Sequence, residues 1–225
     1  MDLREVKLAI FDMDGTMFDT ETLSNKGWRV AVAKQAPDIS DELFNKTFNS
    51  MLGTNMANCR RIANELLPGF DFDIGNAECY AFMDEYMNTH GVPIKPGLLE
   101  LLDKLEELGI KKCVATSTDW KRATHKLEKA NVLHRFEVVV GGDQVKISKP
   151  DPEIFLKAAD ACKVKPEYCV VLEDSAAGTE GGYRAGMRVI HIPDILQPSE
   201  ETRNMSTVIC KDLHEAISYI TSCQA

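Results

Sequence analysis

Four short polar clusters, each at the end of an apolar run, hold the residues of this chain whose types and spacing suit chemistry: FDMDGT at 11–16, ATST at 115–118, SKP at 148–150 and LEDS at 172–175. Together they supply two aspartates, several hydroxyls, an ammonium group and a second acidic pair. Phosphoryl transfer with a bound magnesium ion uses this set of groups. The clusters therefore predict chemistry on a phosphate ester.

Asp12 and Asp14 in the first cluster are separated by one residue, so an extended backbone points both side chains the same way. A carboxylate can attack phosphorus to give an acyl phosphate, and a neighbouring acid can protonate the leaving oxygen and later deprotonate water. Asp12 is the predicted nucleophile, and Asp14 is the predicted acid and base. The alternative, for these two residues alone, is a solvated strand end where aspartates cap a turn.

Metal and phosphate ligands are predicted in the other three clusters. Glu173 and Asp174 supply the hard oxygens that magnesium prefers, and with Asp12 they are the metal ligands that the residues predict. The predicted phosphate-binding residues are Thr116, Ser117 and Lys149. Each cluster also has a plainer interpretation, because an acidic pair before a serine and a threonine before a helix are typical N-caps, and a loop lysine is usually solvated. The inference rests on all four clusters together.

The segments between the clusters predict how they are positioned. Apolar runs typical of buried strands occur at 6–11, 112–115, 136–140, 168–172, 188–192 and 207–210. Helical patterns alternate with them at 98–108, 121–130, 152–162, 176–185 and 213–220. This alternation predicts an α/β fold, a parallel sheet with helices on both faces. Ligands bind at the carboxyl ends of strands in such sheets, so the four clusters are expected at one edge.

The stretch from about 17 to 91 interrupts this alternation. It offers helical segments near 21–36, 40–48, 55–67 and 76–88, without a convincing strand among them. It returns to the α/β pattern through HGVPIKPG at 90–97, whose prolines and glycines suit a hinge. The predicted organisation is an α/β catalytic core from 1–16 and 92–225 with an inserted all-helical cap at 17–91.

Composition excludes several classes of protein. The 225 residues carry a net charge of −9, which argues against a nucleic-acid or anionic-membrane surface. The seven cysteines are scattered and form no CxxC pair, so a disulfide framework or a zinc site is not expected. No stretch approaches the length of a membrane span, and the first residues do not resemble a signal peptide. We expect a cytoplasmic monomer that acts on a small molecule, with no nucleic-acid or membrane partner.

The four clusters resemble, in order, the four motifs of the haloacid dehalogenase superfamily. FDMDGT, Thr116, Lys149 in SKPDPEIF and the segment LEDSAAG carry the resemblance, which spans nearly the whole chain. An insert directly after the first motif is similar to the helical cap of the β-phosphoglucomutase-like branch. The resemblance implies a Rossmann-like core, a mobile cap, Mg²⁺ as cofactor and the residue roles given above. It also implies that Asp14 offers its backbone carbonyl to the metal.

Departures from the motifs favour one activity within this branch. The sugar phosphomutases that the chain resembles carry a histidine and an arginine where this chain has Ser24 and Met56. They also carry Ser-Lys-Asn for a distal phosphate where this chain has Thr118, Asp119 and Trp120, and an aspartate would repel that phosphate. We therefore expect a magnesium-dependent phosphatase of small phosphorylated metabolites, chiefly sugar phosphates, that forms an aspartyl-phosphate intermediate. A sugar phosphomutase and a non-catalytic metabolite-binding protein remain as alternatives.

Substrate selection is expected in the helical insert. Gly53, Thr54 and Asn55 form a predicted loop that faces the site, where Thr54 or Asn55 would bond sugar hydroxyls or, alternatively, cap the next helix. Trp28 would either stack on a ligand or pack inside the insert, and Arg60 would either hold an anionic group or face water.

Overall fold

The computed structural model describes residues 5–52, 54 and 56–224, and the chain divides into two compact units. One unit comprises Met1–Phe18 and Ile94–Ala225, and the other comprises Asp19–Pro93. The sequence placed the boundaries of the insert at 17 and 91, two residues earlier at each end. Phe18 belongs with the first unit because it bridges to Asp14 and to Ile94.

The described residues of the first unit form a six-stranded parallel sheet in the order β3-β2-β1-β4-β5-β6. Its strands are β1 (Leu8–Phe11), β2 (Lys111–Ala115), β3 (Val139–Val140), β4 (Cys169–Glu173), β5 (Arg188–His191) and β6 (Val208–Ile209). β1 lies in the middle, where Leu8 is in register with Lys111 of β2 and with Cys169 of β4. The predicted α/β fold is confirmed.

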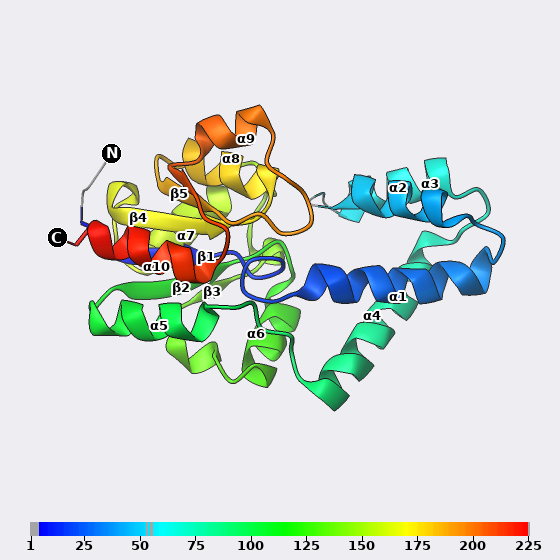
Figure 1. Cartoon of the computed structure of the whole chain (residues 1–225), viewed down its shortest axis with the longest axis horizontal. Helices are drawn as coiled ribbons and strands as arrows, with labels where there is room; N and C mark the ends of the chain where they lie inside the picture. The colour runs from blue at the N-terminus through cyan, green and yellow to red at the C-terminus, as the bar shows by residue number, and fades with distance from the viewer. Residues whose placement is uncertain (1–4, 53, 55, 225) are drawn as a thin grey trace. The chain divides into compact units, whose positions relative to one another are not determined.

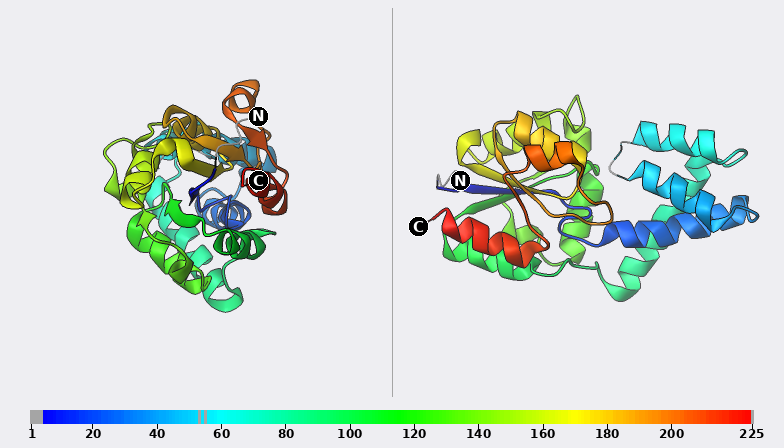
Figure 2. Two further views of the ribbon diagram at one scale, coloured as in Figure 1. Left: turned by 90° about the vertical axis from the view of Figure 1, so that its left-hand side faces the viewer. Right: turned by 45° about the horizontal axis from the view of Figure 1, so that its top comes forward.

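Helices cover both faces of this sheet (Figures 1 and 2). They are α5 (Leu98–Glu107), α6 (Trp120–Lys129), α7 (Glu153–Ala161), α8 (Ala176–Arg184), α9 (Glu200–Met205) and α10 (Leu213–Ser222). Short 3₁₀ turns connect these elements: η1 (Leu133–Arg135) precedes β3, η2 (Gly142–Gln144) follows β3, and η3 (Pro166–Tyr168) precedes β4. α7 packs over β1, β2 and β3, and α8 packs over β4 and β5, whereas α5 packs against α10 on the other face. The sheet is therefore buried between two helical layers.

Two strands and one helix differ from the sequence prediction. The run 136–140 contributes only β3, because the η1 turn ends at Arg135, directly before Phe136, whose ring packs edge-on against Phe11 at 5.7 Å. The run 207–210 likewise contributes only β6. Helix α9 was not predicted because it is short and polar, with Thr202 as its one buried residue.

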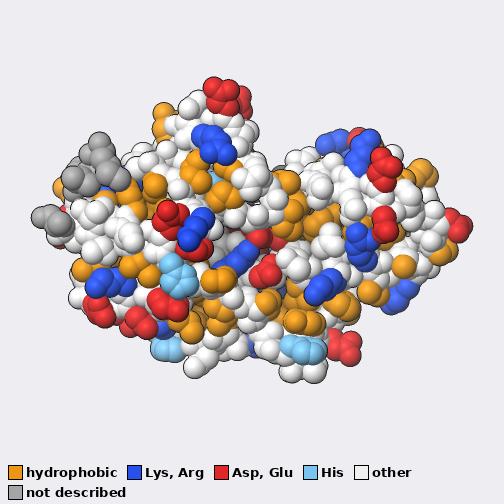
Figure 3. All heavy atoms as spheres, in the orientation of Figure 1, with side chains coloured by type: hydrophobic (Ala, Val, Ile, Leu, Met, Phe, Trp, Pro, Cys, Tyr) orange, Lys and Arg blue, Asp and Glu red, His pale blue; other side chains and the backbone are white. Residues whose placement is uncertain are grey.

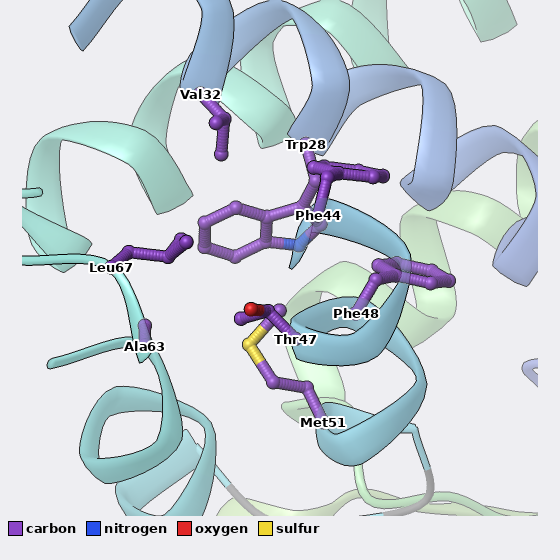
Figure 4. Close-up of a pocket in the computed structure, with 8 residues that line it drawn as sticks. All are labelled: Trp28, Val32, Phe44, Thr47, Phe48, Met51, Ala63 and Leu67. Atoms are coloured by element: carbon purple, nitrogen blue, oxygen red, sulfur yellow. The ribbon is translucent and has the colours of Figure 1, made fainter. Parts of the chain in front are cut away.

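The second unit contains the helices α1 (Thr20–Gln35), α2 (Asp41–Met51), α3 (Met56–Leu66) and α4 (Phe72–His90). Trp28 is buried in this unit against the rings of Phe70 and Phe72, at centroid distances of 6.0 and 5.5 Å. Packing is therefore the role that the structure gives Trp28. The side chain also borders a small apolar pocket, shown in Figure 4, whose lining is Trp28, Val32, Phe44, Thr47, Phe48, Met51, Ala63 and Leu67.

Charges on the face drawn in Figure 3 are mixed, with Lys and Arg side chains scattered among Asp and Glu rather than joined in one basic stripe. In the described part of the chain, no helix is both long enough and apolar enough to cross a bilayer.

Candidate active site

Asp12 lies at the carboxyl end of the central strand β1. Its backbone N–H donates to the Leu172 carbonyl of β4 at 2.9 Å, and its side chain is buried. The chain then turns sharply at Gly15, whose φ of +89° is a left-handed conformation that favours glycine. The strand and this turn together fix the direction of the Asp12 carboxylate.

Lys149 connects three groups at this edge of the sheet. Its Nζ donates to Asp12 Oδ1 at 2.5 Å, to Glu173 Oε1 at 2.7 Å and to the Ala115 carbonyl at 3.1 Å. Burial opposes the charged ammonium, but the charges of Asp12 and Glu173 outweigh it and raise the pKa of Lys149. The lysine is therefore a fixed buried cation between β1, β2 and β4.

The surroundings of Asp12 disfavour its ionised form. Burial raises its pKa to about 8, the negative charge of Glu173 acts in the same direction, and Lys149 only partly offsets them. A single ammonium group thus serves two buried carboxylates. An additional cation beside Asp12 would stabilise the ionised form that a nucleophile requires.

The second acidic pair is held in place by close backbone approach. Glu173 is fully buried, and its Oε2 accepts bonds from the N–H and the hydroxyl of Ser175, both at 2.9 Å. A Cβ at Gly178 would lie 1.7 Å from Glu173 Oε1, so only glycine leaves room for this carboxylate. Asp174 accepts a bond from Thr16 Oγ1 at 2.8 Å, and a Cβ at Gly15 would lie 2.3 Å from its Oδ2.

Asp12, Glu173 and Asp174 each offer one carboxylate oxygen, and these oxygens lie within 4.8 Å of one another. Three hard anionic donors in a partly buried site suit Mg²⁺, which is bound by carboxylates with water and substrate phosphate. The residues present therefore fit the predicted cofactor. Three of the four predicted metal ligands are brought together by their side chains.

Asp14, the fourth, directs its carboxylate to other partners. Thr118 Oγ1 donates to Asp14 Oδ2 at 2.7 Å, and the ammonium group of Lys126 on α6 donates to Oδ1. A role for Asp14 at the metal would therefore use its backbone carbonyl, as the resemblance implies.

The predicted phosphate-binding hydroxyls follow β2 directly. Phe11 is in register with Val114, so Thr116 comes just beyond the end of β2, next to the end of β1. Thr116 is buried, and its Oγ1 accepts the Thr118 N–H at 3.1 Å, whereas Ser117 is exposed. The edge of the sheet thus gathers the carboxylates, the ammonium and the hydroxyls that the sequence selected.

The predicted substrate loop belongs to the other unit. Gly53 and Asn55 lie outside the described residues. Thr54 is exposed, and its hydroxyl donates to the Met51 carbonyl at 2.8 Å. The guanidinium of Arg60 makes two hydrogen bonds to Asp73, at 2.5 and 2.6 Å, so a partner within the unit occupies it.

Several residues at this edge were missed by the sequence prediction. Thr16 holds Asp174, Ser175 holds Glu173, and Lys126 and Thr118 hold Asp14. Lys126 gives a readable signal, because it follows the buried Ala123 by three positions on an amphipathic helix and so lies near its inward side. A charged residue near an inward helical position predicts a buried partner.

Comparison with known proteins identifies the family and several relatives of this chain. A family model described as haloacid dehalogenase-like hydrolase matches residues 9–192. A phosphorylated carbohydrates phosphatase of Thermotoga maritima is 30% identical over 188 residues, covering 83% of this chain and 84% of that protein. The fructose-1-phosphate phosphatase YqaB of Escherichia coli is 27% identical over 191 residues, covering 81% and 94%.

Solved structures share the fold. The crystal structure of CbbY from Rhodobacter sphaeroides in complex with phosphate superposes with a TM-score of 0.77 at 23% identity, covering 93% of this chain and 96% of that one.

Proposed function

The chain belongs to the haloacid dehalogenase-like hydrolases, and from this premise we propose that it hydrolyses phosphate monoesters of small metabolites, chiefly sugar phosphates, with Mg²⁺ and through an aspartyl phosphate on Asp12. The predicted enzyme class, a phosphoric monoester hydrolase, is confirmed by the family match and by the phosphatases among the relatives. The observation that carries the proposal is the buried Asp12 carboxylate, bonded to Lys149 and grouped with Glu173 and Asp174.

In the first half-reaction, a carboxylate oxygen of Asp12 attacks phosphorus and the bond to the ester oxygen breaks. The departing oxygen takes the proton that Asp14 holds, and an alcohol leaves. Lys149 is fixed against Asp12 and keeps this nucleophile oriented. Its positive charge also offsets the repulsion between the Asp12 carboxylate and the negatively charged phosphate. Thr116 and Ser117 would donate to the phosphoryl oxygens.

In the second half-reaction, water attacks phosphorus and the bond to Asp12 breaks. Asp14 takes the proton from the water, and inorganic phosphate leaves. A magnesium ion held by Asp12, Asp174, Glu173 and the Asp14 backbone carbonyl would supply charge neutralisation between phosphate and nucleophile.

Hydrolysis is favoured over phosphoryl transfer to a second sugar. Asp119 caps helix α6 by accepting the Arg122 N–H at 3.0 Å, so a carboxylate stands where the mutases place a group for a distal phosphate. Ser24 and Met56 likewise replace the histidine and arginine of those mutases. Water is therefore the proposed acceptor.

The remaining features are part of the same proposal. We propose a cytoplasmic monomer that acts on small molecules without a nucleic-acid or membrane partner, in keeping with the net charge of −9. Substrate selection by the helical insert predicted at 17–91, with Thr54 among its contacts, stays a prediction.

The test is phosphate release by the purified protein from glucose 6-phosphate, fructose 1-phosphate, ribose 5-phosphate, glycerol phosphate and p-nitrophenyl phosphate, with MgCl₂ and with EDTA. Asp12→Asn should abolish the release, and the matched control Asp160→Asn, an exposed position on α7, should keep it. Wild-type activity that persists in Asp12→Asn would refute the mechanism. Isomer interconversion stimulated by a sugar bisphosphate would identify a mutase, and binding without turnover would identify a sensor.

A further inference from the structure

The Asp14 carboxylate is held by two donors that no other part of the reaction uses. Thr118 Oγ1 donates to Oδ2 at 2.7 Å, and the Lys126 ammonium donates to Oδ1, so each oxygen accepts a bond from a different side chain. The Asp14 and Lys126 side chains are only 23% and 12% exposed. A pair sheltered from water to this degree is stronger than a surface ion pair and better defined in direction.

The fold sends Lys126 to this position from a separate element. Helix α6 begins at Trp120, directly after the motif that follows β2, and its residues Ala123 and Leu127 face the core. Lys121 and Arg122, in the first turn, are exposed to solvent, whereas the side chain of Lys126 is largely buried. Its long aliphatic stem can lie along the helix and carry the charge to the end of the neighbouring strand β1.

Both donors fix the direction in which the Asp14 carboxylate points. An ammonium and a hydroxyl donate hydrogen bonds to a carboxylate, and a charge-assisted bond of this kind is about twice as strong as a neutral one. Asp14 is ionised at one stage of the proposed cycle, after its proton has passed to the leaving oxygen. It then has to remain in place as the base that takes a proton from water.

We propose that Lys126 is a positioning residue that, with Thr118, holds ionised Asp14 ready for hydrolysis of the aspartyl phosphate. In this step water attacks phosphorus, the bond between phosphorus and Asp12 breaks, and one proton of the water passes to Asp14. The contact that assigns this role to Lys126 is its bond to Asp14 Oδ1. The inference rests on the proposed phosphatase function and assigns Lys126 to its second half-reaction.

The two half-reactions can be measured separately with p-nitrophenyl phosphate. Release of p-nitrophenol reports formation of the aspartyl phosphate, and the steady-state rate, together with the mass of acid-quenched protein, reports its hydrolysis. In Lys126→Met we expect a retained burst of p-nitrophenol, accumulation of phosphorylated protein and a fall in kcat of about tenfold to a hundredfold. This loss is smaller than the full contribution of a general base, about 10²- to 10⁴-fold, because Asp14 itself remains. Lys126→Arg should restore most of kcat, because it keeps a cationic donor.

Further variants keep the inference falsifiable if Lys126→Met is unstable. Thr118→Val removes only the second donor and should slow the same step by a smaller factor, whereas Lys121→Met removes an exposed charge of α6 and should change neither step. Melting curves establish that each variant is folded. An unchanged or increased kcat in Lys126→Met, or an equal loss of burst and steady-state rate, would overturn the inference and leave the phosphatase function standing. Absence of turnover in the wild-type protein would instead overturn the function itself.

Discussion

The buried carboxylates of the site predict that magnesium binding is coupled to the release of a proton. Asp12, Glu173 and Asp174 approach one another with Lys149 as the cation bonded to two of them, and the pKa of Asp12 is raised to about 8, chiefly by burial. Below that pH, Asp12 in the metal-free protein holds a proton that Mg²⁺ has to displace. The perturbation to make is therefore a change of pH in the presence and absence of Mg²⁺.

The expected change in Mg²⁺ affinity follows from the displacement of one proton from Asp12. Where Asp12 is protonated, the apparent Kd for Mg²⁺ rises about tenfold for each pH unit that the solution falls below about 8. Between about pH 7.5 and about pH 5.5 the affinity should fall close to a hundredfold, and at saturating Mg²⁺ the stabilisation should fall by about 3 kcal/mol.

The stability of the metal-free protein should change with pH in the opposite direction. A carboxyl whose pKa is raised on folding contributes stability below its unfolded pKa, and this contribution is lost as the pH rises through the folded value of about 8. Melting temperature in EDTA should therefore decline as the pH rises toward about 8, while the increment produced by MgCl₂ should grow.

Differential scanning fluorimetry at several pH values, with EDTA and with graded MgCl₂, measures both trends. Asp12→Asn carries no ionisable group at this position, so its residual Mg²⁺ affinity should lose this proton-linked pH dependence, and Asp160→Asn should behave as wild type. An Mg²⁺ affinity that is constant from about pH 5.5 to about pH 7.5 in the wild-type protein would refute the reasoning that burial keeps a proton on Asp12.

Three further predictions concern packing and titration. Gly178→Ala should displace Glu173, lower the stability by about 1–3 kcal/mol and reduce phosphatase activity at least tenfold, and retention of wild-type activity would contradict the close approach of that carboxylate. Burial lowers the pKa of His191 below its usual 6.5, so this residue contributes stability that is lost as the pH falls through the folded pKa. His191→Gln should therefore flatten the acid side of the plot of melting temperature against pH. An unaltered plot would show that His191 does not make this contribution. Trp28→Ala should cost about 3–5 kcal/mol of stability in the helical unit, measured by denaturant unfolding, and a loss below 1 kcal/mol would show that this ring is not a core residue.

The sequence predicted the sheet and the ends of its strands well because both depend on local signals. The residues of β1, β4 and β5 are all buried, and β2 and β4 are each followed within a few residues by a helix with a polar N-cap, Asp119 for α6 and Ser175 for α8. Parallel topology then brings the carboxyl ends together, so residues distant in sequence become neighbours without any long-range signal of their own.

Contacts that depend on side-chain direction were not predictable in the same way. The resemblance assigned Asp14 a carbonyl contact to metal, but nothing in DxDGT states that Thr118 and Lys126 bind its carboxylate. That contact depends on how α6 packs against β3 and the turns η1 and η2, which no local sequence pattern specifies.

Two glycines of the sequence motifs are nevertheless required by the packing of the site. Gly15 and Gly178 are usually explained by turns and helix starts, but here each faces a carboxylate, Asp174 and Glu173 respectively, at a distance that any Cβ would violate. The two glycines therefore give each acidic side chain the room to reach Asp12, and the DGT and EDSAAG segments act as two halves of one cluster.

Gly181 and Gly182, for which the sequence offered no function, also permit close packing, but away from the reacting groups. A Cβ at Gly181 would lie 3.0 Å from the Phe155 ring, and one at Gly182 would lie 2.9 Å from a methyl group of Val189. Glycine here costs helix propensity, about 1 kcal/mol at each position, but lets α8 approach α7 and the sheet closely. Because α8 begins directly after Glu173 and Asp174, this close packing also fixes where the second acidic pair lies relative to Asp12.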